Sequence, residues 1–316
     1  MGDGGRMAVG SRAWLVVVLA LVAAGGSSAC TSTRSDGPAV AGQRSATPAG
    51  SAAHAATLHY ISNTHADRAG AAKLGYNLFD MAPTKADIDA LGPGQQALVW
   101  LGNLDNTSCT PGFSYPKFTA AVDRLAGDRK VFGYYLSDEP HPSVCPDAAA
   151  HIRQRADYIR AKDPTQRSFI VVLDADAQCG SSPGCEFAAL RPDRTHVDLI
   201  GVDPFVCSIG KGCGFDRIGT TVGLAETKGI PRAALVPVIQ VFGQTCNTEQ
   251  SHYYKLPSQD ELRQALARWD AEVPDPVFDF AYTWASLGPA CPALDRADGT
   301  GGNADLQSII KERNAR

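Results

Sequence analysis

The chain has 316 residues, of which 44% are hydrophobic and 20% are charged, a composition typical of a globular protein. Its formal net charge is −4, and residues 30–316 hold 27 basic against 32 acidic side chains. Binding to a nucleic-acid backbone requires a basic stripe, which this sequence lacks, so nucleic acid is excluded as a partner.

The first predicted element is an export signal at residues 1–29. Arg6 and Arg12 precede an uncharged apolar run of 12 residues, Ala13–Ala24, and the small residues Gly25–Ala29 follow it. A basic start, an apolar core and a small-residue end are the parts of a secretory signal peptide. The apolar run is shorter than the roughly 20 residues that span a bilayer, so a transmembrane anchor is the weaker alternative.

Cys30 directly follows the small residues and resembles the lipidated cysteine of a bacterial lipoprotein, although Ser27 stands where that motif favours Leu. The chain has 9 cysteines, and lipidation of Cys30 leaves an even number, which suits disulfides in an exported protein. We therefore expect a lipid anchor on the outer face of the cell membrane, with ordinary secretion as the alternative. Residues 30–56, rich in Ala, Gly, Ser, Thr and Pro, predict a disordered tether.

Residues 57–316 are predicted to form one domain, in which eight short strands alternate with helices. Most of the strand segments are continuous apolar runs, as expected for strands buried on both faces of a parallel sheet. The predicted strands are Leu58–Asn63, Tyr76–Met81, Ala97–Asn103, Val131–Ser137, Ser168–Asp174, Val197–Asp203, Leu235–Phe242 and Phe278–Trp284.

Helical patterns lie between these strands. Apolar residues recur at helical spacing in Asp147–Lys162, Ser258–Glu272 and Ala304–Arg313, and Ser258 with Glu261 forms a capping box. Eight strand–helix units in 260 residues predict a single (β/α)₈ TIM barrel. An open doubly wound sheet is the alternative, but the Gly-rich phosphate turn usual after its first strand is missing.

The remaining eight cysteines all follow predicted strands. In a barrel this places them in the βα loops, at the end where active sites lie. Adjacency suggests the pairs Cys109–Cys145, Cys179–Cys185, Cys207–Cys213 and Cys246–Cys291, although the sequence alone cannot choose among the possible pairings. Zinc binding is the alternative, but no CxxC pair is present and the predicted location is outside the cell.

The strongest chemical signal is the end of the fourth predicted strand, Tyr135-Leu-Ser-Asp-Glu139-Pro140. Two consecutive carboxylates at the catalytic end of a barrel offer an acid–base group. Alternation along the strand places Glu139 on the same side as Tyr135 and opposite to Asp138, so Glu139 is the predicted general acid/base. A helix cap or a salt bridge at the barrel rim is the alternative.

This segment resembles the clan A glycoside hydrolases, whose general acid/base is a Glu in an Asn-Glu-Pro tripeptide after strand four. Glu139 and Pro140 match the tripeptide, whereas Asp138 replaces an Asn that donates to a sugar hydroxyl, and an ionised Asp can only accept. The resemblance implies a barrel that acts on poly- or oligosaccharides without a cofactor. Trp284 stands where these barrels often place a Trp that stacks on sugar.

One departure from the family concerns the nucleophile. Clan A retaining enzymes carry a Glu at the end of strand seven, where this chain has Gln240, and an amide cannot attack an anomeric carbon. Asp203, at the end of the sixth predicted strand, is the predicted substitute, although it could equally brace its own loop. Asp80 and then Asp174 or Asp176 are weaker candidates.

A set of polar and aromatic side chains near strand ends is predicted to bind the sugar, since flat rings bind pyranose faces and polar groups read the hydroxyls. The set comprises Asp80, Asn103, Tyr135, Asp138, Gln240 and Trp284. For Tyr135, core packing is the stronger alternative. No HExxH motif or close His pair is present, so no metal is predicted.

The sequence thus leaves two hypotheses for what we expect to be a monomeric, exported protein. The first is a glycosidase with Glu139 as acid/base and Asp203 as second carboxylate. The second is a barrel that binds glycans without cleaving them, which Gln240 favours.

Overall fold

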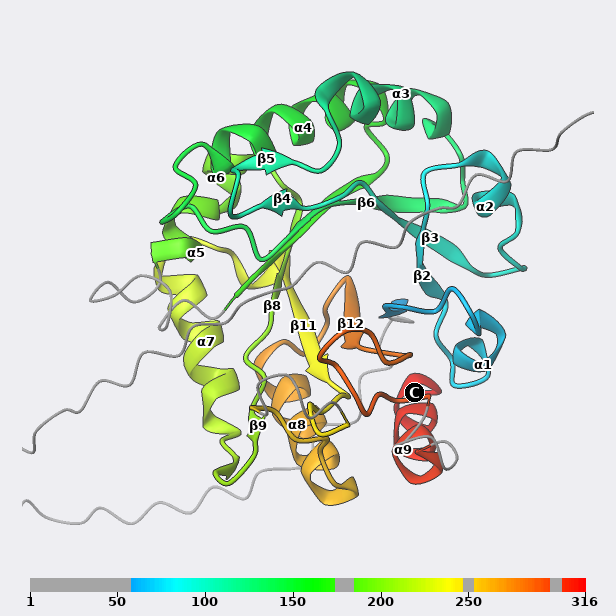
Figure 1. Cartoon of the computed structure of the whole chain (residues 1–316), viewed down its shortest axis with the longest axis vertical. Helices are drawn as coiled ribbons and strands as arrows, with labels where there is room; N and C mark the ends of the chain where they lie inside the picture. The colour runs from blue at the N-terminus through cyan, green and yellow to red at the C-terminus, as the bar shows by residue number, and fades with distance from the viewer. Residues whose placement is uncertain (1–57, 174–184, 247–252, 296–302) are drawn as a thin grey trace, which may run out of the picture. The chain divides into compact units, whose positions relative to one another are not determined.

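A computed structural model describes residues 58–173, 185–246, 253–295 and 303–316 (Figure 1). The predicted signal peptide, the tether and Cys30 lie outside the described residues, as do Asp174, Asp176 and Cys179. Among the described residues, no helix is long and apolar enough to cross a membrane.

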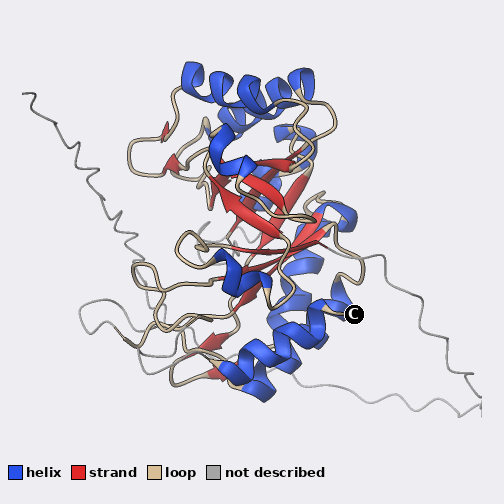
Figure 2. Ribbon diagram, turned by 90° about the vertical axis from the view of Figure 1, so that its right-hand side faces the viewer, coloured by secondary structure: helices blue, strands red, loops and turns tan. Residues whose placement is uncertain are grey.

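Eight parallel strands close into a barrel, in the order β1-β12-β11-β8-β7-β6-β3-β2 (Figures 1 and 2). All eight predicted strands are therefore confirmed, and the fold is the (β/α)₈ TIM barrel. The barrel strands are β1 (Leu58–Ile61), β2 (Leu78–Met81), β3 (Gln96–Trp100), β6 (Val131–Asp138), β7 (Arg167–Val172), β8 (Leu199–Val202), β11 (Leu235–Gln240) and β12 (Phe278–Tyr282).

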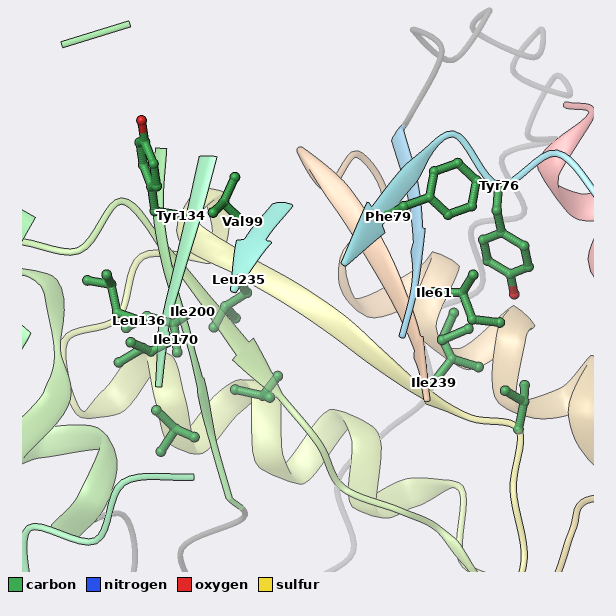
Figure 3. Close-up of a cluster of buried hydrophobic side chains, with 14 of the residues drawn as sticks. Ile61, Tyr76, Phe79, Val99, Tyr134, Leu136, Ile170, Ile200, Leu235 and Ile239 are labelled. Atoms are coloured by element: carbon green, nitrogen blue, oxygen red, sulfur yellow. The ribbon is translucent and has the colours of Figure 1, made fainter. Parts of the chain in front are cut away.

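Side-chain alternation along these strands divides the apolar core into two layers. Residues such as Tyr60, Phe169 and Phe280 fill the barrel interior. Their neighbours in sequence, such as Ile61 and Ile170, point outward and pack under the helices (Figure 3). Because each strand is buried on both faces, its sequence is almost continuously apolar.

Helices follow the strands and cover the outside of the barrel (Figure 2). The capping box predicted for α8 is confirmed, since Ser258 N donates to Glu261 Oε2 at 2.8 Å and Glu261 N to Ser258 Oγ at 3.4 Å. The helices are α1 (Arg68–Ala72), α2 (Lys85–Asp89), α3 (Tyr115–Leu125), α4 (Ala148–Lys162), α5 (Cys185–Leu190), α6 (Pro192–Thr195), α7 (Asp216–Thr227), α8 (Gln259–Glu272) and α9 (Ala304–Asn314), with a 3₁₀ turn at Arg232–Ala234.

Two small hairpins in the βα loops were not expected from the sequence. They are β4 (Leu104–Asp105) with β5 (Thr110–Pro111), and β9 (Cys207–Ser208) with β10 (Gly212–Cys213).

Disulfides are also found in the βα loops. Three of the four predicted pairs are present, Cys109–Cys145, Cys207–Cys213 and Cys246–Cys291. The fourth predicted pair includes Cys179, which lies outside the described residues.

A buried ion network, here called the Asp279 network, joins α8 and α9 to the barrel. Asp279 in β12 is 1% exposed and accepts from His59 Nδ1 at 3.0 Å and from Arg313. Arg313 also donates to Asp270 in α8 at 2.9 Å. The nearby positive charges hold the pKa of the Asp279 carboxyl below its usual range despite burial.

Candidate active site

Glu139 directly follows β6, at the carboxyl end of the barrel strands, and its side chain is half-buried. Its φ of 44° is in the left-handed region that residues other than glycine rarely adopt. The backbone is held there on both sides, because Glu139 N donates to Val171 O at 3.0 Å and Glu139 O accepts from Asn106 Nδ2 at 2.9 Å. The direction of this side chain is therefore set by its surroundings.

The Glu139 carboxyl is hydrogen-bonded to the carboxyl of Asp203, which follows β8 and is 3% exposed. Two carboxyl groups can form such a bond only when one of them holds a proton. A pair of carboxyls in direct contact leaves no room between them for the water of an inverting glycosidase, whose carboxyls lie roughly 6.5–9.5 Å apart. In this arrangement the two groups can share one proton.

Burial raises the pKa of Glu139 to about 7, the Asp138 charge adds to the increase, and the bond to Asp203 opposes it. Burial also raises the pKa of Asp138, and this rise is opposed by Tyr135, whose hydroxyl donates to Asp138 Oδ1 at 2.7 Å. We call Asp138, Glu139 and Asp203 the carboxylate cluster. A group that keeps its proton near neutral pH can act as a general acid.

Aromatic rings border the carboxylate cluster. Phe205 stacks on Tyr282 with ring centroids 6.0 Å apart and meets Tyr254 edge-on at 5.5 Å. The charges of Glu139 and Asp203 add to burial in raising the pKa values of both tyrosines, which places both phenols close to the cluster. Tyr254 was not predicted from the sequence, because it reaches the site through the loop pairing of Ser208 with Tyr254.

Gln240, in the expected nucleophile position at the end of β11, is 5% exposed and bonded to two loops. Its Oε1 accepts from Cys207 N at 2.9 Å, and its Nε2 donates to Cys207 O and to Lys255 O at 3.0 Å each. The amide therefore ties these loops to the barrel. From Leu235 to Cys246 the sequence has no carboxylate that replaces it.

Asn103 and Asp80 also bond to neighbouring loops. Asn103 Oδ1 accepts from Asp138 N at 2.6 Å. Asp80 accepts from Thr64 Oγ1 at 3.1 Å and lies 3.1 Å from His65 Nε2, which raises the pKa of that imidazole. Sugar binding by these two residues stays a prediction.

Trp284 follows β12 and is 3% exposed, with its ring packed in the outer core layer. Tyr135 is also 3% exposed, and its ring contacts Trp100 edge-on at 4.7 Å. Both rings therefore pack in the core, which for Tyr135 was the alternative expected from the sequence. Sugar stacking on either ring stays a prediction.

Within the described residues, one group of side chains has spacing suited to a metal ion, namely Cys207, Cys213 and Glu261. The two sulfur atoms are joined in a disulfide, so they do not serve as thiolate ligands.

Solved structures of similar fold include glycoside hydrolases. The C-terminal domain of a putative chitinase from Desulfitobacterium hafniense aligns with a TM-score of 0.54 at 9% identity, over 84% of this chain and 100% of that one. The GH18 chitinase ChiB of Flavobacterium johnsoniae gives 0.51 at 11% identity, over 83% and 94%.

A β-glucuronidase of Ruminococcus gnavus aligns with a TM-score of 0.51 at 11% identity, over 78% of this chain. This chain spans 45% of that enzyme's length. No protein-family model matches the sequence, and a search of curated proteins finds no match. At these identities the likeness shows the barrel fold alone.

Proposed function

We propose that the protein is a glycoside hydrolase that acts outside the cell on oligo- or polysaccharides, with Glu139 as its general acid. The observation that carries the proposal is the Glu139–Asp203 pair at the carboxyl end of the barrel, with a Glu139 pKa near 7. The chitinases and the glucuronidase of similar fold support the substrate class.

In this mechanism Glu139 keeps its proton until a glycosidic oxygen takes it. Loss of that proton in the absence of substrate would place a poorly solvated charge beside the Asp138 carboxylate. Desolvation and this repulsion keep the proton on Glu139 near neutral pH. As the leaving-group oxygen gains negative charge in the transition state, it becomes the stronger base and accepts the proton.

No carboxylate occupies the usual nucleophile position, where Gln240 is bonded to the loops, and Asp203 contacts the acid itself. We therefore propose a route in which a group of the substrate attacks the anomeric carbon, as in substrate-assisted glycosidases. The acetamido oxygen of a 2-acetamido sugar is such a group. Aryl 2-acetamido glycosides should be cleaved, whereas the matched 2-hydroxy glycosides should not.

The test of the acid is Glu139→Gln, which keeps the size of the side chain and removes the transferable proton. We expect turnover of glycans with poor leaving groups to fall by about 10²-fold or more, while glycan binding persists. The matched control is Glu186→Gln, since Glu186 is another buried glutamate, 1% exposed, in α5. Full activity of Glu139→Gln on a natural glycan would refute the catalytic assignment.

A second candidate function is glycan binding without cleavage. It is favoured by Gln240, whose amide is built into the loop structure in place of a nucleophile. Calorimetric binding of a glycan to the wild type, combined with no product from any linkage tested, would support it over hydrolysis.

The extracellular location is part of the proposal. It is supported by the signal-like sequence of residues 1–29 and by three disulfides, which persist in oxidising compartments. Metabolic labelling with a fatty-acid analogue should mark the wild type and leave Cys30→Ser unlabelled and released into the medium. Equal labelling of both proteins would contradict a lipid on Cys30.

A further inference from the structure

We propose that Asn106 is a positioning residue that holds Glu139 in its proton-donating geometry, and that the Cys109–Cys145 disulfide holds Asn106 in place. The inference rests on the proposed function of Glu139. It concerns a side chain that the sequence did not single out.

One carboxamide spans the Glu139-Pro140 dipeptide. Asn106 Nδ2 donates to Glu139 O at 2.9 Å, and Asn106 Oδ1 accepts from His141 N at 2.9 Å. Pro140 has no N–H, so the regular hydrogen bonding of the strand stops at this point. Asn106 therefore satisfies the two backbone groups that flank the proline.

The conformation of Glu139 requires such support. A residue with a β-carbon at φ 44° is sterically unfavourable and persists only where its surroundings determine it. On its other side, the Glu139 backbone is held by the bond from its N–H to Val171 O at 3.0 Å. Without Asn106, the Glu139 carbonyl would lose its hydrogen bond, and the Glu139 backbone could rotate to the negative φ that such residues prefer.

Asn106 is itself fixed by the hairpin that carries it. Asp105 Oδ1 accepts from Thr107 N at 2.8 Å and from Ser108 N at 3.3 Å, and Asp105 O accepts from Cys109 N at 2.7 Å. These bonds form a tight turn around Asn106 between β4 and β5.

The same hairpin is joined to the Glu139 segment at both of its ends. At one end, Leu104 N donates to Ser137 Oγ at 3.1 Å. At the other end, Cys109 is bonded to Cys145, and Cys145 N donates to His141 O at 2.7 Å. The disulfide and these hydrogen bonds thus form a closed ring through Asn106 and His141. Asn106 cannot move away from Glu139 unless one bond of this ring breaks.

The first experiment measures the pKa of Glu139 by NMR titration of ¹³C-labelled glutamate carboxyls in the whole protein. In Asn106→Ala, Glu139 turns toward water and regains hydration, the loss of which is the main cause of its raised pKa, so its pKa should fall by about one unit toward the ordinary value of about 4.3. Asn106→Asp keeps the acceptor for His141 N, loses the donor to Glu139 O and adds a negative charge that raises the pKa of a neighbouring acid, so a smaller fall is expected. The double variant Cys109→Ser/Cys145→Ser should shift the pKa in the same direction.

The matched control is Asn314→Ala. Asn314 Nδ2 also donates to a backbone carbonyl, Leu74 O at 3.1 Å, but near the start of β2 at the opposite end of the strands. This variant should leave the Glu139 pKa unchanged. Thermal unfolding of each variant shows whether it remains folded, and Asn106→Asp supplies the titration if Asn106→Ala does not fold.

Activity provides the second readout. On a glycan that the wild type cleaves, Asn106→Ala should lower kcat by about tenfold and change KM by less than about twofold, because the acid and not the binding surface is displaced. An unchanged Glu139 pKa in both Asn106 variants, or an equal shift in Asn314→Ala, would overturn the inference. If the wild type cleaves no glycan, the hydrolase proposal fails, while the titration still decides the role of Asn106.

Discussion

The two ends of the barrel strands bury carboxylates in opposite ways. At the amino ends, the Asp279 network surrounds one acid with His59 and Arg313, and the pKa of Asp279 is lowered. At the carboxyl ends, the carboxylate cluster brings three acids together, and the pKa values of Asp138 and Glu139 are raised.

This difference separates structural from chemical use of a buried acid. A carboxylate that is paired with a buried arginine, as Asp279 is with Arg313, joins helices to the barrel and has no proton to exchange near neutral pH. An acid whose neighbours are acids resists ionisation and can transfer its proton to a substrate. The carboxyl-end loops are joined by disulfides, whereas the amino-end network is joined by ion pairs.

The largest loss of stability is expected when the ion-paired carboxylate at the amino ends of the strands is removed. Asp279→Asn leaves Arg313 buried without its main counter-charge, so the free energy of unfolding should fall by about 3–5 kcal/mol. Glu139→Gln removes a carboxyl whose ionisation is opposed by burial, and should leave stability at neutral pH unchanged or higher. Urea unfolding of both variants at pH 7 measures the comparison, and equal losses would show that the two ends do not differ.

The second prediction concerns the disulfides of the carboxyl-end loops. Cys246–Cys291 closes 45 residues and Cys207–Cys213 closes 6, so replacing each pair with Ser should cost about 4 and about 2 kcal/mol respectively. Thiol titration of the denatured, unreduced protein should find no free thiol among Cys109, Cys145, Cys207, Cys213, Cys246 and Cys291. Any reactive thiol in this set would contradict the pairing.

The third prediction is a pH dependence of stability that differs in sign between the two ends of the barrel strands. The pKa of Glu139 is raised in the folded protein, so its contribution to stability is present below the unfolded pKa and is lost as pH rises through about 7. Relative to Glu139→Gln, the wild type should lose on the order of 2–3 kcal/mol between pH 4 and pH 8. For Asp279 the sign is opposite, because its lowered pKa gives stability that disappears as pH falls into the acid range.

If the free energies of unfolding of the wild type and Glu139→Gln differed by the same amount from pH 4 to pH 8, the pKa of Glu139 would not be raised in the folded protein. Asp279→Asn serves as the matched control. The difference between its free energy of unfolding and that of the wild type should shrink in acid and stay constant from pH 5 to pH 8.

The sequence predicted the barrel well because strand burial, helix caps and cysteine positions are local patterns. The capping box of Ser258 with Glu261 follows directly from neighbouring residues, and the fourth strand, predicted as Val131–Ser137, extends one residue further, to Asp138. Glu139 was also predicted as the leading acid from its place at the end of a buried strand, and that role stays a prediction. The alternation that placed Asp138 opposite Tyr135 was wrong, because the register shifts between Tyr135 and Ser137 and the Tyr135 hydroxyl donates to Asp138 Oδ1.

Other features depend on side chains that meet across the barrel, and local patterns do not encode such meetings. The hydrogen bond of Glu139 to Asp203 joins residues of two different strands, and the bonds of Gln240 depend on how the β9 loop folds back. Asn106 resembles any loop asparagine in the sequence, and its role arises because a left-handed Glu139 exposes backbone groups beside it. Local periodicity thus determined which residues form the strands, whereas the tertiary structure alone decided which polar groups meet at their ends.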